Sequence, residues 1–217
     1  MVDLAAPEQH VSQQWNYVRN TSSNNIFNLA DSISTAFRQT AGATPTPRLI
    51  RWNNNNIQCT ILNVAGSCNG DPIRIGFGGV FRNHSGTYLA GFSGTISHSQ
   101  DILFVELTTL YQGLMLAISF NYEELACYSD FLLTVNLIKD DLNHFHVYVV
   151  IIQNIKDLMS SRNFSLHHSF REGNQCADFM TKLGGLNDVE LSIHSFPPED
   201  LLPLLRTDEL GALFLRR

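Results

Sequence analysis

The spacing of hydrophobic positions changes along the chain from a strand pattern to a helix pattern. Residues 57–64, 75–82 and 87–96 are rich in β-branched and aromatic side chains and are separated by turn residues, which predicts three consecutive strands. Apolar residues then recur every three or four positions between 103 and 117, which predicts a helix over 102–120. This part of the chain is therefore expected to form an antiparallel meander followed by a long helix.

After this helix, strand patterns alternate with helix patterns. Further strands are predicted at 125–128 and 164–170, and further helices at 131–138, 147–160 and 174–184. Three strands, a helix, a strand, two helices, a strand and a helix imply one mixed sheet with helices on its faces. The predicted fold class is α/β.

Composition divides the chain into three parts. Nearly half of residues 1–56 are Ser, Thr, Asn, Gln, Gly or Pro, so we interpret them as a polar leader or linker that is mostly disordered. Residues 57–185 carry the pattern of one globular domain. Residues 186–217, which contain Pro197-Pro198, are predicted to be a loose C-terminal extension that packs on the domain or on a partner.

Charge and cysteine usage exclude several classes of protein. The 217 residues carry a formal charge of −6, which excludes a polybasic nucleic-acid coat. The four cysteines are scattered singly without a CxxC pair, as is typical of reduced thiols in an intracellular protein. Neither a secretory signal nor a run of about 20 apolar residues is present. We therefore expect a location in the nucleus or cytoplasm, no secretion and no membrane partner.

Three carboxylates stand in unusual places for solvated charges. Glu106 lies inside the apolar helix, Asp130 directly follows a predicted strand, and Asp178 lies in the first turn of the last predicted helix. Ligands of α/β proteins bind at the carboxyl ends of strands, and carboxylate oxygens suit Mg²⁺ or Mn²⁺. A helix cap for Asp130 and a favourable helix dipole for Asp178 are simpler alternatives.

Eight short motifs extend through the predicted domain. They are LNVAGS at 62–67, GFGGVFRN at 76–83, AGFS at 90–93, VEL at 105–107, GL at 113–114, SD at 129–130, VNLI at 135–138 and REGNQCAD at 171–178. In this order they resemble the ribonuclease H-like domain of plant retroelements, a type 1 ribonuclease H associated with reverse transcriptases. The resemblance implies a five-stranded mixed sheet with flanking helices, and two divalent metals that assist cleavage of the RNA strand of RNA–DNA hybrids.

The resemblance assigns roles to the three carboxylates and exposes one departure. Glu106, Asp130 and Asp178 match the second, third and fourth catalytic, metal-binding carboxylates of the family, whereas Ala65 stands where the family has its first Asp. A methyl group cannot coordinate a cation, so we expect one Mg²⁺ or Mn²⁺, or none, and impaired cleavage. The alternatives are an active hybrid endonuclease in which Asn63 or Asp71 supplies the missing ligand, and a non-enzymatic retroelement remnant or interaction module.

The resemblance also indicates how nucleic acid would be held. Gly66, Ser67 and Asn174 are the positions expected to contact the 2′-hydroxyls that mark the RNA strand. The expected partners are an RNA–DNA hybrid or another nucleic acid, and other modules of a retroelement polyprotein. No small-molecule cofactor is expected.

Overall fold

The computed structural model describes residues 48–53, 57–71, 73–97, 99–141 and 145–216. The described residues all belong to one compact unit, Arg48–Arg217, which is called the second unit below. Residues 1–47 of the predicted leader lie outside the described residues, so their disorder stays a prediction.

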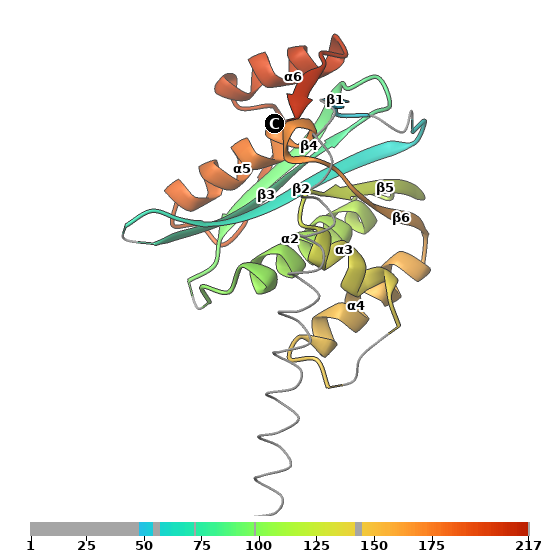
Figure 1. The fold of residues 1–217 in the computed structure, drawn as a ribbon, viewed down its shortest axis with the longest axis vertical. Helices are drawn as coiled ribbons and strands as arrows, with labels where there is room; N and C mark the ends of the chain where they lie inside the picture. The colour runs from blue at the N-terminus through green and yellow to red at the C-terminus, as the bar shows by residue number, and fades with distance from the viewer. Residues whose placement is uncertain (1–47, 54–56, 72, 98, 142–144, 217) are drawn as a thin grey trace, which may run out of the picture. The chain divides into compact units, whose positions relative to one another are not determined.

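A six-stranded mixed sheet forms the centre of the second unit (Figure 1). Its strand order is β6-β5-β2-β3-β4-β7. The strands are β2 (Thr60–Asn69), β3 (Arg74–Arg82), β4 (Tyr88–Thr95), β5 (Glu124–Ser129), β6 (Asn163–His168) and β7 (Ser192–His194). The antiparallel meander β2-β3-β4 and the parallel pairs β2-β5 and β5-β6 confirm the predicted α/β class.

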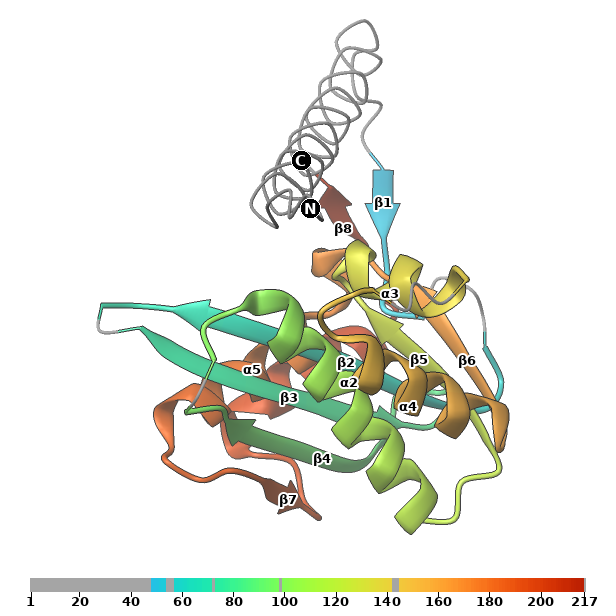
Figure 2. The same ribbon diagram turned by 90° about the horizontal axis from the view of Figure 1, so that it is seen from below.

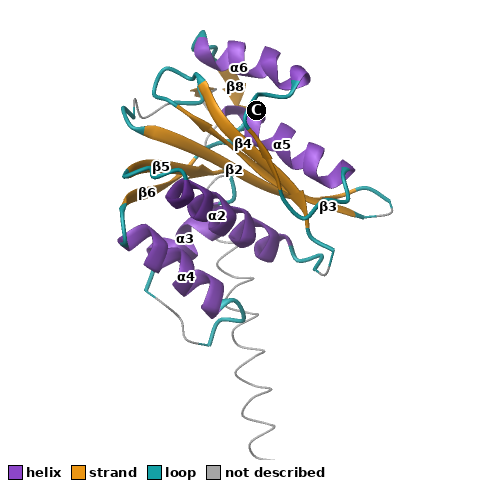
Figure 3. Ribbon diagram, turned by 180° about the vertical axis from the view of Figure 1, so that it is seen from behind, coloured by secondary structure: helices purple, strands orange, loops and turns teal. Residues whose placement is uncertain are grey.

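Helices cover both faces of this sheet (Figures 1 and 3). One face carries α2 (Ile102–Ser119), α3 (Leu132–Lys139) and α4 (Val149–Ser160), and the other carries α5 (Gln175–Leu186) and α6 (Leu202–Glu209). The α2 helix begins where it does because the Asp101 carboxylate accepts the Leu103 backbone N–H at 2.9 Å, which satisfies a free donor of the first turn. The four helices predicted after residue 100 agree with the observed ones to within two residues at each end.

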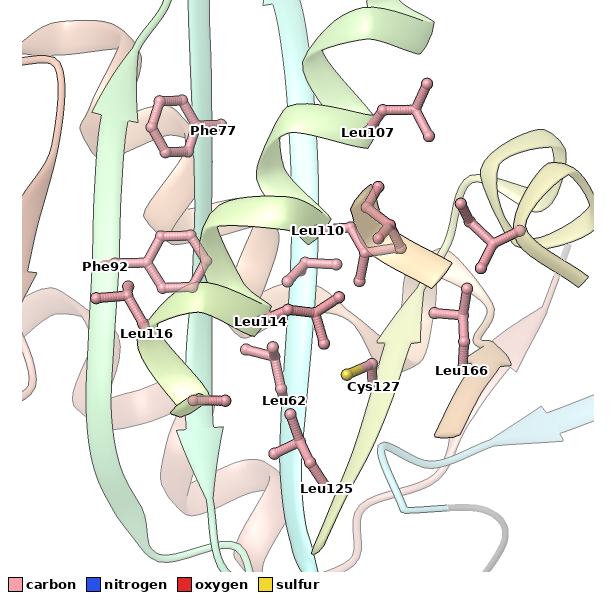
Figure 4. Close-up of a cluster of buried hydrophobic side chains, with 14 of the residues drawn as sticks. Leu62, Phe77, Phe92, Leu107, Leu110, Leu114, Leu116, Leu125, Cys127 and Leu166 are labelled. Carbon is pink, nitrogen blue, oxygen red and sulfur yellow. The ribbon is translucent and has the colours of Figure 1, made fainter. Parts of the chain in front are cut away.

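The main hydrophobic core lies between the sheet and α2, α3 and α4 (Figure 4). Leu62 and Leu125 from the sheet and Leu110 and Leu114 from α2 are fully buried there. By length and composition alone α2 could cross a membrane, but half of it is buried inside this unit. The apolar character of α2 therefore follows from its place as the core helix.

On the opposite face, α5 packs almost directly on the sheet backbone. A Cβ atom at Gly78 would lie 2.7 Å from the carbonyl carbon of Met180, which is closer than real Cβ contacts. Met180 and Val80 form a second buried cluster with Leu201 and Leu205 from the C-terminal segment. The segment packs on the domain as predicted, but the expectation that it is loose is wrong, because its leucines complete the core on the α5 face.

The compact unit is also wider than the predicted domain at 57–185. Strand β7, from the predicted extension, pairs antiparallel with β4 and adds a sixth strand to the expected five. At the other end, β1 (Arg48–Ile50), which lies in the predicted leader, pairs antiparallel with β8 (Phe214–Arg216) to form a separate two-stranded sheet (Figure 2). The boundary therefore lies at Arg48, and the C-terminal segment belongs to the same unit.

Candidate active site

The candidate site lies where β5 ends and β2 continues. Val64 on β2 pairs with Ser129, the last residue of β5, so Asp130 leaves the sheet beside Ala65. Ala65 is only 4% exposed and pairs with Gly78 on its other side. Since the next residue, Gly66, faces α2, the alternation of a strand turns the Ala65 methyl group toward α5.

Glu106 reaches this position from the second turn of α2. A Cβ atom at Gly66 would lie 2.8 Å from Val105 Cγ1 and 3.3 Å from Glu106 Cδ, so glycine allows the helix to approach the strand. Burial, and next the charge of Asp130, raise the pKa of Glu106 to about 8, while the Gly66 backbone N–H and Arg171 oppose the shift. Glu106 Oε2 is buried and has no hydrogen-bond partner among the described residues. This oxygen is available to a proton or a cation.

Asp130 is coupled to two other carboxylates and to one cation. Burial is the main cause that raises its pKa; the Asn174 amide and Arg171 oppose the shift, and the charge of Asp178 adds to it. The Arg171 Nε atom lies 3.8 Å from Asp130 Oδ2. Asp130 therefore interacts electrostatically with both Glu106 and Asp178.

Asp178 is carried to the site by α5 but is paired with a cation of its own. Thr181, on the same helix, donates a hydrogen bond to the Ala65 carbonyl oxygen at 2.8 Å and so ties α5 to β2. Lys182 Nζ lies 2.6 Å from Asp178 Oδ2, one helical turn away. Among the described residues, no group of three or more His, Cys, Asp or Glu side chains is arranged to hold a metal ion. The three carboxylates share a neighbourhood without forming such a cluster.

The sequence of the chain matches a known family. Residues 63–184, more than half of the chain, match the family described as reverse transcriptase-like. The chain belongs to this family. A relative from Arabidopsis thaliana named "Putative ribonuclease H protein" is 27% identical over an alignment of 176 residues, which covers 78% of this chain and only 27% of that protein. The chain thus spans about a quarter of the length of this relative.

Solved structures of ribonuclease H domains share the fold of this reverse transcriptase-like chain. The RNase H1 of Halobacterium salinarum has a TM-score of 0.52 at 18% identity, over 58% of this chain and 96% of that one. A compost-derived RNase H1 in complex with an RNA/DNA hybrid has a TM-score of 0.52 at 19% identity, with the same two coverages. The foamy viral protease-reverse transcriptase with an RNA/DNA hybrid has a TM-score of 0.53 at 14% identity, over 67% of this chain and 22% of that one. The chain therefore has a ribonuclease H-like fold.

Neither Asn63 nor Asp71 is in a position to supply the carboxylate that the resemblance would place at Ala65. Asn63 is fully buried; its Oδ1 accepts a hydrogen bond from Arg82 Nη2 at 2.8 Å and its Nδ2 donates to Asn174 Oδ1 at 3.0 Å. Asp71 is exposed in the β2–β3 turn, beyond the last strand pair Asn69–Arg74. At about 3.3 Å per residue, the strand carries that turn more than roughly 13 Å beyond Ala65. The expectation that either residue supplies the ligand is not supported by these positions.

Asn174 has a different place from the one expected. It is 1% exposed, and its Nδ2 donates to the Val64 carbonyl oxygen at 2.9 Å and to Asp130 Oδ1 at 3.1 Å. Its amide is thus already engaged inside the protein, and we assign it to holding Asp130 rather than to contacting a 2′-hydroxyl. Gly66 and Ser67 are partly exposed beside the site and remain candidates for that contact.

Sequence reasoning missed the cations of the site. Asp178 and Lys182 stand four residues apart on a helix, a spacing that brings opposite charges together and could have revealed the pair. Arg171, next to Asp130, left no such signal, because its position depends on the short 3₁₀ turn at Arg171–Gly173.

Proposed function

We propose that the chain is a ribonuclease H-like domain that binds RNA–DNA hybrids and in which cleavage of the RNA strand is impaired at Ala65. The observation that carries this proposal is the buried methyl group of Ala65 beside Asp130, where the resemblance places the first metal-binding Asp. Structures of ribonuclease H domains in complex with RNA/DNA hybrids share the fold, which supports a hybrid as the partner.

The carboxylate oxygens that remain as ligands fit one divalent cation better than two. Ribonuclease H homologues generally use divalent metals. Glu106, with its unpartnered Oε2, and Asp130 would hold a single Mg²⁺ or Mn²⁺, since carboxylate oxygens are the ligands these ions prefer. Asp178 is paired with Lys182, and Ala65 offers no donor. A single ion would stabilise charge on a phosphate oxygen, but these ligands do not fit the two-metal arrangement.

The cations beside the carboxylates are the proposed phosphate contacts. The side chains of Arg171 and Lys182 are 77% and 65% exposed, and both flank the site. Residues 57–185 otherwise hold few positive charges, with seven basic residues against eleven acidic ones. Contact with only a few phosphates predicts weak binding with a shallow salt dependence, because each neutralised phosphate contributes about 0.9 to the slope of log K against log salt.

The wider setting of the domain is part of the same proposal. Because the chain spans about a quarter of its Arabidopsis relative, we expect it to act beside other modules of a retroelement polyprotein. No small-molecule cofactor is required for the proposed binding.

Hybrid binding is tested by fluorescence anisotropy with the full chain, without divalent metal and with Mg²⁺. We expect tighter binding to an RNA–DNA hybrid than to duplex DNA of the same sequence. Arg171→Ala should lower the salt slope by about one unit. Arg162→Ala, at an exposed ion pair with Glu123, is the matched control and should leave the slope unchanged. Equal affinity for both duplexes, or no binding to either, would contradict the proposal.

A further inference from the structure

A line of buried polar contacts joins the C-terminal helix α6 to Asp130. Asp208 on α6 accepts a hydrogen bond from Arg82 Nη1 at 2.6 Å, and Arg82 Nη2 donates to Asn63 Oδ1 at 2.8 Å. Asn63 then donates to Asn174 Oδ1 at 3.0 Å, and Asn174 donates to Asp130 Oδ1 at 3.1 Å. Every member except Asp130 is less than 5% exposed.

Because Arg82 can only donate hydrogen bonds, it determines which end of each amide in this line donates and which accepts. A guanidinium has donors and no acceptor, so the amide of Asn63 must turn its oxygen toward Arg82 and its NH₂ group toward Asn174. Asn174 must then turn its oxygen toward Asn63, which leaves its NH₂ group facing Asp130 and the Val64 carbonyl oxygen. An amide turned the other way would present an oxygen to two further oxygens.

Arg82 is itself held from several sides. Asp208 also accepts a hydrogen bond from the Cys176 thiol on α5 at 3.3 Å, and the Arg82 guanidinium lies 4.2 Å from the centre of the Trp52 ring. A buried ion pair is weak evidence for a gain in stability, because desolvation offsets much of the attraction. The pair is better explained by the geometry that it imposes on its neighbours.

We propose that Arg82, fixed by Asp208, is a positioning residue that sets the orientation of the Asn63 and Asn174 amides, so that Asp130 receives an N–H rather than an oxygen. The C-terminal segment is then part of the machinery that presents Asp130. The relevance of this device to hybrid cleavage rests on the proposed function, whereas the amide orientation does not.

The test is Asn63→Asp in the full chain, a change that keeps nearly the same shape but accepts on both oxygens. The introduced carboxylate would accept from Arg82 and from the Asn174 NH₂ group, so Asn174 would have to turn. In the native protein, NMR should show nuclear Overhauser contacts between the Asn174 side-chain amide protons and the Asp130 β protons. In Asn63→Asp these contacts should disappear, and contacts to the β protons of residue 63 should replace them. Retention of the Asp130 contacts in the variant would overturn the proposal.

A second variant covers the case in which Asn63→Asp does not fold. Arg82→Met combined with Asp208→Leu removes the ion pair as a unit and leaves Asn63 Oδ1 without its donor, so that only the Val64 carbonyl oxygen and Asp130 still orient the Asn174 amide. We expect the Asn174 amide protons then to contact both Asp130 and residue 63, as two orientations; a single native orientation would refute the role of Arg82. Arg162→Met, which breaks the exposed pair with Glu123, is the control and should keep the native contacts.

A functional readout separates this proposal from the proposed function. In a chain that also carries Ala65→Asp, Asn63→Asp should lower kcat for hybrid cleavage at least tenfold and leave the hybrid Kd within twofold. An equal loss in kcat and in binding would indicate general damage and count against positioning. If Ala65→Asp alone does not cleave, the proposed function fails, and the NMR contacts still decide the amide orientation.

Discussion

Replacing Ala65 with aspartate adds a carboxylate at the point where β5 ends and β2 continues. Ala65 is 4% exposed and lies on β2 beside Asp130, which directly follows β5. Its side chain faces α5, the helix that carries Asp178. Without a divalent cation the new carboxylate meets like charges in a buried place, and like charges oppose ionisation. We therefore expect Ala65→Asp to unfold at a lower urea concentration than the native chain in EDTA, and to recover part of the difference in Mg²⁺.

The same substitution should increase cleavage by a large factor. A second metal activates the attacking water or stabilises the leaving oxygen, and each effect is worth several kcal/mol. If restoring that metal lowers the barrier by about 4 kcal/mol, the rate rises about a thousandfold, at about 1.36 kcal/mol for each factor of ten. The assay is single-turnover cleavage of a fluorescently labelled RNA–DNA hybrid in Mg²⁺, with native chain and variant at equal concentration.

Two control variants distinguish the added charge from the added bulk. Ala65→Asn has nearly the same shape without the charge and should stay close to native activity. Ala65→Asp combined with Asp130→Asn should also stay inactive, because a neighbouring carboxylate is lost. Robust cleavage by the native chain would refute the reasoning, as would an Ala65→Asp variant that binds both hybrid and Mg²⁺ without any gain in rate.

Three further predictions concern stability. The pKa of Glu106 is raised to about 8 in the folded state, so its contribution to stability is complete below about pH 4 and is lost as the pH rises to about 8. The urea concentration at the unfolding midpoint should therefore decrease between pH 5 and pH 8. The decrease should be smaller in Glu106→Gln. Asp208→Ala leaves Arg82 buried without its partner and should lower the free energy of unfolding by about 3–5 kcal/mol, whereas the exposed Asp200→Ala should change it by less than about 0.5 kcal/mol, both measured by urea denaturation. Leu114→Ala, in the main core, should cost about 2–5 kcal/mol by the same measurement, and an unchanged midpoint would show that the core tolerates the cavity.

The elements that follow a simple period could be predicted from the sequence. The leucines of α2 recur at helical spacing, and the strands of the meander are short apolar runs bounded by turns; β3 is buried on both faces, so it shows no alternation but still reads as a strand. Strand β7 could not be predicted in this way, since it has three residues and is stabilised by pairing with β4 rather than by a pattern of its own. The burial of the C-terminal segment likewise depends on contacts with α5 and β3 that leave no local trace.

The candidate site also contains residues that could be predicted from local sequence and one residue that could not. The positions of Glu106 and Asp130 follow from a helix face and a strand end, both of which are local features. The role of Asn174 depends on Asn63, which lies 111 residues away in the sequence. A polar residue in a short loop reads as exposed, so only the folded structure shows that its amide is buried and engaged.

Because α5 packs closely on the sheet, a substitution at Ala65 and one at Gly78 would have different consequences. Ala65 and Gly78 lie directly opposite each other on paired strands. A side chain at Gly78 would collide with the backbone of α5 and force the helix, with Asp178, away from the sheet. A change at position 65 alters the donor set while the pairing of the strands stays the same. Mutations can therefore remove or restore chemistry at Ala65 in a chain that still folds, whereas at Gly78 they would abolish the fold and the chemistry together.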